Sequence, residues 1–285
     1  MQSSHYSKHL AELVGRREPF AVATVTRTEG STLAKPGFKL LITDKGEIAA
    51  GTFGGGCPEG PIVEAARQAI AAGEPRVLRI HLVDTEQAVG GTVRETDPNE
   101  IWVQTNCGGT LEVYVEPMLP THRLLLIGQG GRDDVEGALV HWGKLLGFEV
   151  VVVDPSPVLA ESPHVLIEAS HPDVEQLRLS RHDFVVVLTK GERDVAVLEA
   201  LSRSPVPFVG LLASRHRARQ DREELTKRGV PSGFLDALRS PIGLDIGAKT
   251  PEELALAIMA EVVAVKYGKA PARPPSGERA ENHRP

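Results

Sequence analysis

The stretch that decides the fold is Arg123–Pro155, which reads RLLLIGQGGRDDVEGALVHWGKLLGFEVVVVDP. An apolar run, Leu124–Ile127, leads directly into the glycine loop Gly128-Gln129-Gly130-Gly131. A segment with apolar residues at helical spacing follows, and a second apolar run, Glu149–Val153, ends at Asp154. Short continuous apolar runs are typical of strands buried on both faces of a parallel sheet. The stretch therefore predicts a strand–helix–strand unit of a Rossmann-like fold.

The same alternation continues toward the C-terminus, which predicts a doubly wound parallel sheet with right-handed crossovers. The last helix has a clear start signal, because Thr250 can cap it, Pro251 takes its first position and Glu253 completes a capping box. Further strands are expected at Val165–Ala169, Phe184–Leu188 and Phe208–Leu212, each buried on both faces, and helices at Val135–Leu146, Asp194–Ser202, Arg217–Arg228 and Pro251–Lys266.

The first half of the chain has a different pattern, rich in short β-branched runs. Phe20–Thr26 and Lys39–Thr43 are predicted strands, and the turn Asp44-Lys45-Gly46 predicts a hairpin. An alanine-rich helix is expected at Pro61–Ala72. The fold class is therefore α/β, with a Rossmann-like C-terminal domain and a mixed, β-rich α+β N-terminal domain.

A proline-containing break at Glu116–Arg123 separates the two patterns. We expect an N-terminal domain over residues 1–118, a Rossmann-like domain over 122–268 and a disordered tail over 269–285, where proline, arginine and polar residues show no periodicity. A chain of 285 residues is long enough for two domains.

Composition excludes several functional classes. The net charge of −6 and the aromatic content of 4% disfavour nucleic-acid binding. No run approaches the roughly 20 apolar residues of a membrane helix, and Met1–Gly15 contains no apolar signal core. With only two cysteines, the chain cannot form a disulfide framework. These features predict a cytoplasmic protein that binds a small molecule, with no membrane or nucleic-acid partner.

The loop after Ile127 is a candidate nucleotide site. Gly128 and Gly130 allow close approach of a phosphate to the backbone, and Asp154 stands where a ribose hydroxyl would bind. However, Asp133 replaces the third glycine of the usual pattern, and it repels a pyrophosphate. The alternative is a turn that serves only strand-to-helix packing.

Two glycine–cysteine segments stand out in the first half. Gly54-Gly55-Gly56-Cys57 and Cys107-Gly108-Gly109 contain both cysteines of the chain. Such glycine runs favour no regular element and permit close approach of backbone amides to a ligand. Cys57 precedes a predicted helix, where the dipole favours a thiolate that can bind a soft metal. Alternatively, both cysteines are small buried hydrophobic residues.

Two further residues are candidate ligand contacts. Arg215 follows the predicted strand Phe208–Leu212, at the edge where open α/β sheets bind ligands, and its guanidinium suits a phosphate. The alternative for Arg215 is an exposed helix face. Asp245, between Gly243 and Gly247, is a candidate to accept from an amino group of a ligand, and the alternative is that it accepts from nearby backbone amides.

Several of these segments resemble the XdhC/CoxI family of xanthine dehydrogenase and carbon monoxide dehydrogenase accessory proteins. The resemblance spans nearly the whole chain apart from its termini, and the GGGC and PIGLDIGAKTPEE motifs are its most specific parts. The matching segments are AVATVTRTEGSTLAK (21–35), GTFGGGCPE (51–59), CGGTLEVYVEP (107–117), KLLGFEVVVVDP (144–155), FVGLLASR (208–215) and SPIGLDIGAKTPEELALAIMA (240–260).

The resemblance implies a maturation chaperone more than an enzyme, with no catalytic residue assigned. Its cargo would be the molybdenum cofactor, as molybdopterin or its dinucleotide form, protected during sulfuration and handed to an apo-molybdoenzyme of the xanthine dehydrogenase class. A cysteine desulfurase and a second copy of the chain are the other implied partners. Cys57 and Cys107 fall on the family's motif cysteines, and Gly54–Gly56 on its glycine run. The chain departs from the family at Gly128–Asp134, which lacks the usual histidine.

Two alternatives from other classes remain. The first is an NAD(P)-dependent oxidoreductase that uses the Rossmann-like domain, although the sequence contains no evident tyrosine–lysine or histidine–aspartate pair at useful spacing. The second is a scaffold that bridges the desulfurase and its target without holding the cofactor.

Overall fold

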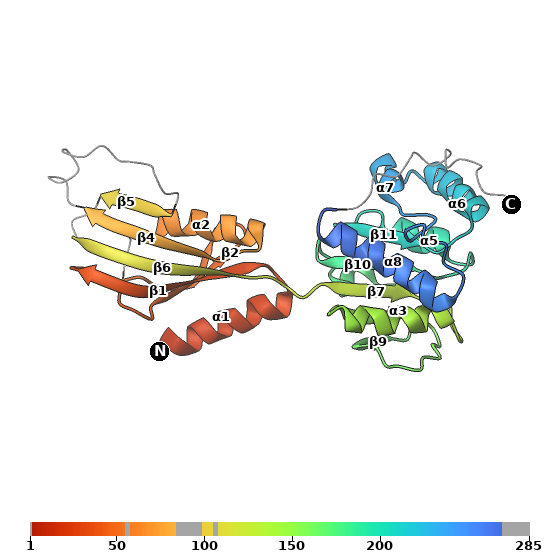
Figure 1. Cartoon of the computed structure of the whole chain (residues 1–285), viewed down its shortest axis with the longest axis horizontal. Helices are drawn as coiled ribbons and strands as arrows, with labels where there is room; N and C mark the ends of the chain where they lie inside the picture. Colours follow the sequence, from red (N-terminus) through yellow and green to blue (C-terminus); the bar gives the residue numbers. More distant parts are fainter. Residues whose placement is uncertain (1, 55–57, 84–98, 105–107, 270–285) are drawn as a thin grey trace. The chain divides into compact units, whose positions relative to one another are not determined.

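The computed structural model describes residues 2–54, 58–83, 99–104 and 108–269. The chain divides into two compact units, Met1–Pro120 and Thr121–Pro285, and Figure 1 labels most of their elements. The tail predicted from residue 269 onward lies outside the described residues, except for Lys269. None of the helices in the described ranges is both long enough and apolar enough to span a membrane.

The first unit is built on a six-stranded sheet with the strand order β3-β2-β1-β6-β4-β5. Neighbouring strands are antiparallel, except for the parallel pair β4–β5. The predicted hairpin is confirmed, since β2 and β3 pair across the Asp44-Lys45-Gly46 turn. The elements are α1 (Gln2–Arg16), β1 (Phe20–Gly30), β2 (Lys39–Thr43), β3 (Ile48–Gly51), α2 (Glu59–Ala72), β4 (Arg76–Val83), β5 (Glu100–Gln104) and β6 (Gly109–Met118).

Helix α2 covers one face of this sheet and forms its main core. Ile62, Ala66 and Ala69 on the helix are buried against alternate residues of β1, β4 and β6, such as Leu78 and Val113. The opposite face is covered next to β2 and β3 by α1, where Leu13 packs with Leu41. Because strand side chains alternate between faces, the residues between the core positions of β1, β4 and β6 point away from α2.

The second unit contains a five-stranded parallel sheet with the strand order β11-β10-β7-β8-β9. This confirms the Rossmann-like, doubly wound prediction. The order reverses between β7 and β10, and open α/β sheets bind ligands at such a point, outside the carboxyl ends of the strands. The elements are β7 (Arg123–Ile127), α3 (Asp134–Leu145), β8 (Glu149–Val153), β9 (Val165–Ile167), α4 (Val174–Leu177), β10 (Asp183–Val187), α5 (Asp194–Leu201), β11 (Phe208–Leu211), α6 (Arg215–Lys227), α7 (Ser232–Ala237) and α8 (Pro251–Lys266).

Helices cover both faces of the parallel sheet, which explains the continuous apolar runs. In β7, Leu124 and Leu126 join the core that includes α3 and α8, whereas Leu125 and Ile127 join the core that includes α5 and α6. The predicted capping box of α8 is present, because the Thr250 hydroxyl accepts from the Glu253 amide and the Glu253 carboxylate accepts from the Thr250 amide.

One strand differs from its prediction. The run at Val165–Ala169 was expected to be buried on both faces, and this was wrong. The strand β9 ends at Ile167 and forms the edge of the sheet, with 40% of Val165 and 44% of Leu166 exposed. An apolar run alone does not distinguish a central strand from an edge strand. Helix α1 was not predicted, since its apolar positions are few among charged and polar residues.

Candidate functional site

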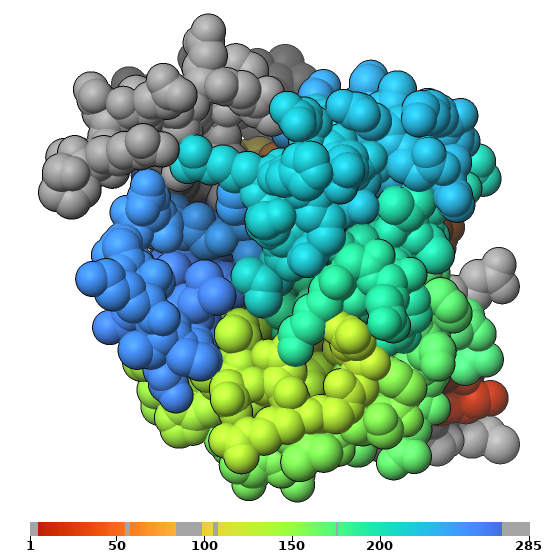
Figure 2. Space-filling view, turned by 90° about the vertical axis from the view of Figure 1, so that its right-hand side faces the viewer, coloured from red at the N-terminus to blue at the C-terminus, as the bar shows by residue number. Residues whose placement is uncertain are grey.

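The carboxyl edge of the parallel sheet brings together the loops that follow β7, β8, β10 and β11. Figure 2 faces this end of the second unit, where segments coloured yellow-green, green and cyan lie next to one another. Gly128 and Gly130 follow β7, Asp154 follows β8 and Arg215 follows β11. The structure thus places these four predicted site residues at one edge of the sheet.

The glycine loop is held from within by Asp154. Its Oδ2 accepts from the Gly130 amide at 2.7 Å, and its Oδ1 accepts from the Ser156 amide at 2.8 Å. Only 1% of Asp154 is exposed. A Cβ on Gly128 would lie 2.0 Å from Asp154 Oδ2, so the glycine is required by this close packing. In this structure the carboxylate stabilises the loop, and its binding to a ribose stays a prediction.

Glu136, which was not predicted from the sequence, is a second carboxyl group behind the loop. It lies in the first turn of α3, is 1% exposed, and neither oxygen accepts or donates a hydrogen bond among the described residues. Burial, followed by the nearby charges of Asp154 and Asp133, raises the pKa of Glu136 to about 8. It therefore carries a proton at neutral pH. The sequence spacing of Glu136 relative to Leu139, Val140 and Gly143 puts it on the same face of the helix, so its burial could have been predicted.

Basic residues after β10 tie the loop to its neighbours. Arg193 donates to the carbonyl of Gly128 at 2.6 Å and to the carbonyl of Ser170. Lys190 lies 3.0 Å from Asp133 Oδ2, and Asp133 caps α3 by accepting from the Val135 and Glu136 amides. Arg193 and Lys190 thus bind carbonyl and carboxylate groups of the protein, and these contacts hold the glycine loop in a defined conformation.

After β11, Arg217 pairs with a buried carboxylate. A different arginine, Arg215, was predicted from the sequence as the candidate ligand contact. Arg217 Nε lies 3.0 Å from the buried Asp194, and Arg215 is exposed at the first position of α6. Burial and the charge of Asp194 raise the pKa of Asp221, which lies in the same cluster, to about 6. Asp245 is exposed in the segment before α8. Phosphate or pterin contacts of Arg215 and Asp245 stay predictions.

In the first unit, three described glycines in or next to the glycine–cysteine segments, Gly51, Gly54 and Gly109, are required for steric reasons, whereas a Cβ on Gly108 would meet nothing within 4 Å. Gly51 has a φ of +98°, and a Cβ there would lie 2.0 Å from the Lys39 carbonyl oxygen. Gly54 has a φ of +95°, and a Cβ there would lie 3.1 Å from Leu33 Cβ. The segment Gly51–Gly54 is thus packed against β2 and against the loop after β1. The predicted residues Gly55, Gly56 and Cys57 lie outside the described residues.

The second glycine–cysteine segment approaches the same loop. Gly109 has a φ of +153°, and a Cβ there would lie 2.6 Å from the Glu29 carbonyl oxygen and 2.8 Å from Thr32 Cγ2. Cys107 lies outside the described residues. The described residues next to both cysteine motifs therefore pack on one short segment, residues 29–33, which comprises the end of β1 and the start of the loop after it. Among the parts of the chain that the structure describes, no group of three or more His, Cys, Asp or Glu side chains is placed to hold a metal ion.

Comparison with known proteins places these features in a family. Residues 124–262 match the model of the XdhC Rossmann domain, and residues 13–81 match the model of the XdhC and CoxI family. A crystal structure described as a xanthine dehydrogenase from Bacillus halodurans covers 92% of this chain and 96% of its own, at 21% identity and a TM-score of 0.44.

Two curated relatives are similar in sequence. The uncharacterized protein YqeB of Escherichia coli (strain K12) is 31% identical over 264 residues, which are 90% of this chain and 45% of that protein. A probable xanthine dehydrogenase subunit of Bacillus subtilis (strain 168) is 29% identical over 161 residues, which are 54% of this chain and 46% of that protein. The matched region thus spans less than half the length of either relative. With both family models matched in order along its two units, the chain belongs to the XdhC and CoxI family.

Proposed function

We propose that this chain binds the molybdenum cofactor in its first unit and delivers it to an apo-enzyme of the xanthine dehydrogenase class. The observation that carries the proposal is that two described glycines near the cysteines in sequence, Gly54 and Gly109, pack on the same short segment of the chain. Gly54 packs on Leu33, and Gly109 packs on Glu29 and Thr32, so residues close in sequence to both cysteines contact the one segment 29–33.

The chemistry of these motifs suits such a cargo. The cofactor combines a pterin, a dithiolene-bound molybdenum and a phosphate or dinucleotide. Glycine-rich backbone offers amide donors to a phosphate without steric hindrance, and a cysteine thiolate is a soft ligand for a metal or a carrier of sulfur. We assign the metal-proximal role to Cys57 and a supporting role to Cys107.

The partners follow from the same proposal. The name of the Bacillus subtilis relative, a probable xanthine dehydrogenase subunit, supports a xanthine dehydrogenase-type partner. A cysteine desulfurase would supply the sulfur that the cofactor receives before delivery. We further propose that the chain acts in the cytoplasm as a homodimer. Gly128, Gly130, Asp154, Arg215 and Asp245 are proposed as secondary contacts for a nucleotide extension of the cofactor.

Transfer of the cofactor provides a test of delivery. The chain, loaded with cofactor under anaerobic conditions, is expected to activate an apo-xanthine dehydrogenase, measured as the rate of xanthine oxidation. Cys57→Ser should reduce activation at least tenfold, whereas Cys107→Ser should have a smaller effect. If Cys57→Ser activates the apo-enzyme as well as the parent chain does, Cys57 has no role in cofactor transfer. If activation does not depend on loading at all, the chain is a scaffold and the proposal is wrong.

A further inference from the structure

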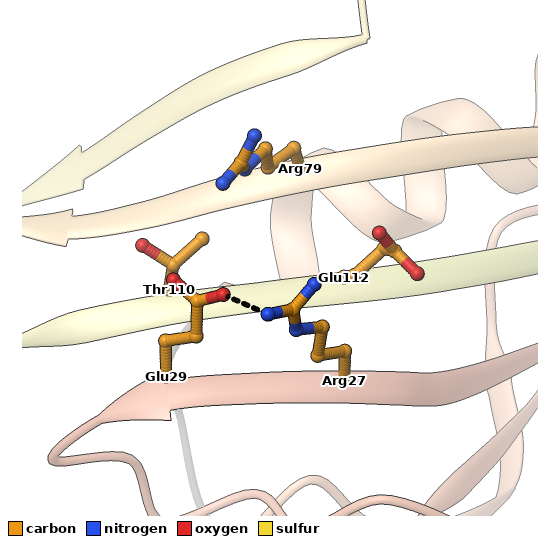
Figure 3. Close-up of a pocket in the computed structure, with 5 residues that line it drawn as sticks. All are labelled: Arg27, Glu29, Arg79, Thr110 and Glu112. Carbon is orange, nitrogen blue, oxygen red and sulfur yellow. Dashed lines mark ion pairs between the residues drawn. The ribbon is translucent and has the colours of Figure 1, made fainter.

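The first unit has a polar depression on the sheet face that points away from α2. Five residues line it: Arg27, Glu29, Arg79, Thr110 and Glu112. Figure 3 shows that Arg27 and Glu29 come from β1, Thr110 and Glu112 from β6, and Arg79 from β4. Their sequence neighbours in the same strands, such as Leu78 and Val113, are buried on the side of α2.

The strand register arranges these side chains in two rows. Glu112 is paired with Arg27 on one side and with Arg79 on the other. In the next row, Thr110 is paired with Glu29 and with His81. The depression therefore presents one carboxylate between two guanidinium groups, on strands about 10 Å apart across β6, a distance that two arginine side chains can reach across.

The charged groups of the first row, Arg27, Glu112 and Arg79, still have hydrogen-bonding positions that a ligand can occupy. The Arg79 side chain forms no hydrogen bond or ion pair with any residue in the described ranges. Arg27 Nη2 lies 2.8 Å from Glu29 Oε1, in a pair that is largely exposed to solvent and is therefore weak. Glu112 Oε1 accepts from the Thr26 hydroxyl at 2.8 Å, which leaves Oε2 and the second lone pair of Oε1 available to two further donors.

The second row is held by a hydrogen-bonded chain. His81 Nε2 lies 3.0 Å from Glu100, and His81 Nδ1 lies 3.3 Å from the Thr110 hydroxyl. Trp102 stacks on His81 with the ring centroids 4.8 Å apart. When His81 donates to Glu100, its other nitrogen accepts from Thr110, so the Thr110 oxygen can still accept from a ligand.

This set of groups selects a particular chemistry. A simple anion would satisfy the arginines but would face the carboxylates of Glu29 and Glu112, and a simple cation would face the arginines. A flat ring edge with two adjacent donors between two acceptors satisfies all three groups of the first row. The 2-amino-4-oxo edge of pterin has this pattern, and guanine carries the same one.

We propose that this depression binds the 2-amino-4-oxo edge of a fused pyrimidine ring, with Glu112 accepting from the two adjacent N–H donors and Arg27 and Arg79 donating to the flanking acceptors. The inference rests on the proposed function in identifying the ring as the pterin of the molybdenum cofactor. Its location agrees with that role, because Thr110 directly follows Gly109 of the second glycine–cysteine motif and Glu29 is the first residue of the segment 29–33 on which Gly54 and Gly109 pack.

Pterin fluorescence provides the test. The full chain is titrated with free pterin, with lumazine, in which an oxo group replaces the 2-amino group, and with guanosine. We expect pterin to bind and lumazine to bind at least tenfold more weakly, because its oxygen would face Glu112. Glu112→Gln and Arg79→Met should each weaken pterin binding about ten- to a hundredfold, as expected for loss of a charge-assisted hydrogen bond. Guanosine binding as tight as that of pterin would assign the edge to a nucleotide base.

The matched control is Arg76→Met, in the same strand as Arg79, because Arg76 contacts Gln68 of α2 on the other face. It should leave pterin binding unchanged, and circular dichroism should show that all three variants fold. Equal binding of pterin and lumazine, or unchanged binding by both site variants, would overturn the inference. Molybdenum content separates the two proposals: if the parent and both site variants retain equal molybdenum, the edge assignment fails and the carrier function stands. If the parent chain retains no molybdenum but binds pterin through Glu112, the edge assignment stands and the carrier function fails.

Discussion

Glu136→Gln is expected to stabilise the second unit by about 3 kcal/mol at pH 7 and to change its stability little at pH 4.5. The ordinary pKa of glutamate is 4.5, and burial and the neighbouring Asp154 and Asp133 raise it to about 8 in the folded chain. Between these two values the unfolded state releases a proton that the folded state keeps. The folded state thus loses stability as the pH rises from about 4.5 to about 8, and glutamine, which resembles the protonated acid, removes this loss.

Urea unfolding of the parent chain and the variant at pH 4.5, 6 and 8 measures the effect. Asp134→Asn is the matched control, because Asp134 lies in the same helical turn but its side chain is 56% exposed, in an ion pair with Arg132. The control should shift the free energy of unfolding by less than about 0.5 kcal/mol at every pH. A gain for Glu136→Gln that is equal at pH 4.5 and pH 8 would show that Glu136 is not held protonated.

Gly51→Ala is expected to destabilise the first unit by roughly 3–5 kcal/mol and to impair cofactor retention. The backbone of Gly51 lies in the left-handed region, and the new Cβ would lie 2.0 Å from the Lys39 carbonyl oxygen, so β2 and β3 would have to separate. The segment that leads to Cys57 begins at this residue, and the same change would therefore displace the proposed cofactor site.

Thermal unfolding followed by circular dichroism provides the measurement. Gly60→Ala is the control, because Gly60 lies within α2 and a Cβ there meets nothing within 4 Å. The control should be neutral or slightly stabilising, since alanine favours helix over glycine. If Gly51→Ala unfolds at the same temperature as the parent chain, the backbone geometry assigned to this segment is wrong.

The architecture of the second unit was predictable because its signals are local. The runs Leu124–Ile127 and Glu149–Val153, the glycine turn and the helical spacing between them each determine one element, and together they predict parallel strands. The hairpin at Asp44–Gly46 was predictable for the same reason. Helix α1 and the exposure of β9 were not, because both depend on which surfaces the rest of the fold leaves uncovered.

The candidate sites were predictable only in part. The glycines at 51, 54, 109 and 128 were visible as motifs, and the structure supplies the close contacts that require them. The row of Arg27, Glu112 and Arg79 was not visible, since these residues come from three strands and only the sheet register aligns them. The same holds for Arg193, whose contact with the Gly128 carbonyl joins loops 65 residues apart in sequence.

The most direct test of the central claim is the molybdenum and pterin content of this chain when it is purified without oxygen from cells that make the cofactor. Native mass spectrometry and elemental analysis should find about one pterin and one molybdenum for each chain, and Gly51→Ala should lower both together. Purified protein that contains neither, from cells in which molybdoenzymes are active, would contradict the claim that this chain carries the cofactor.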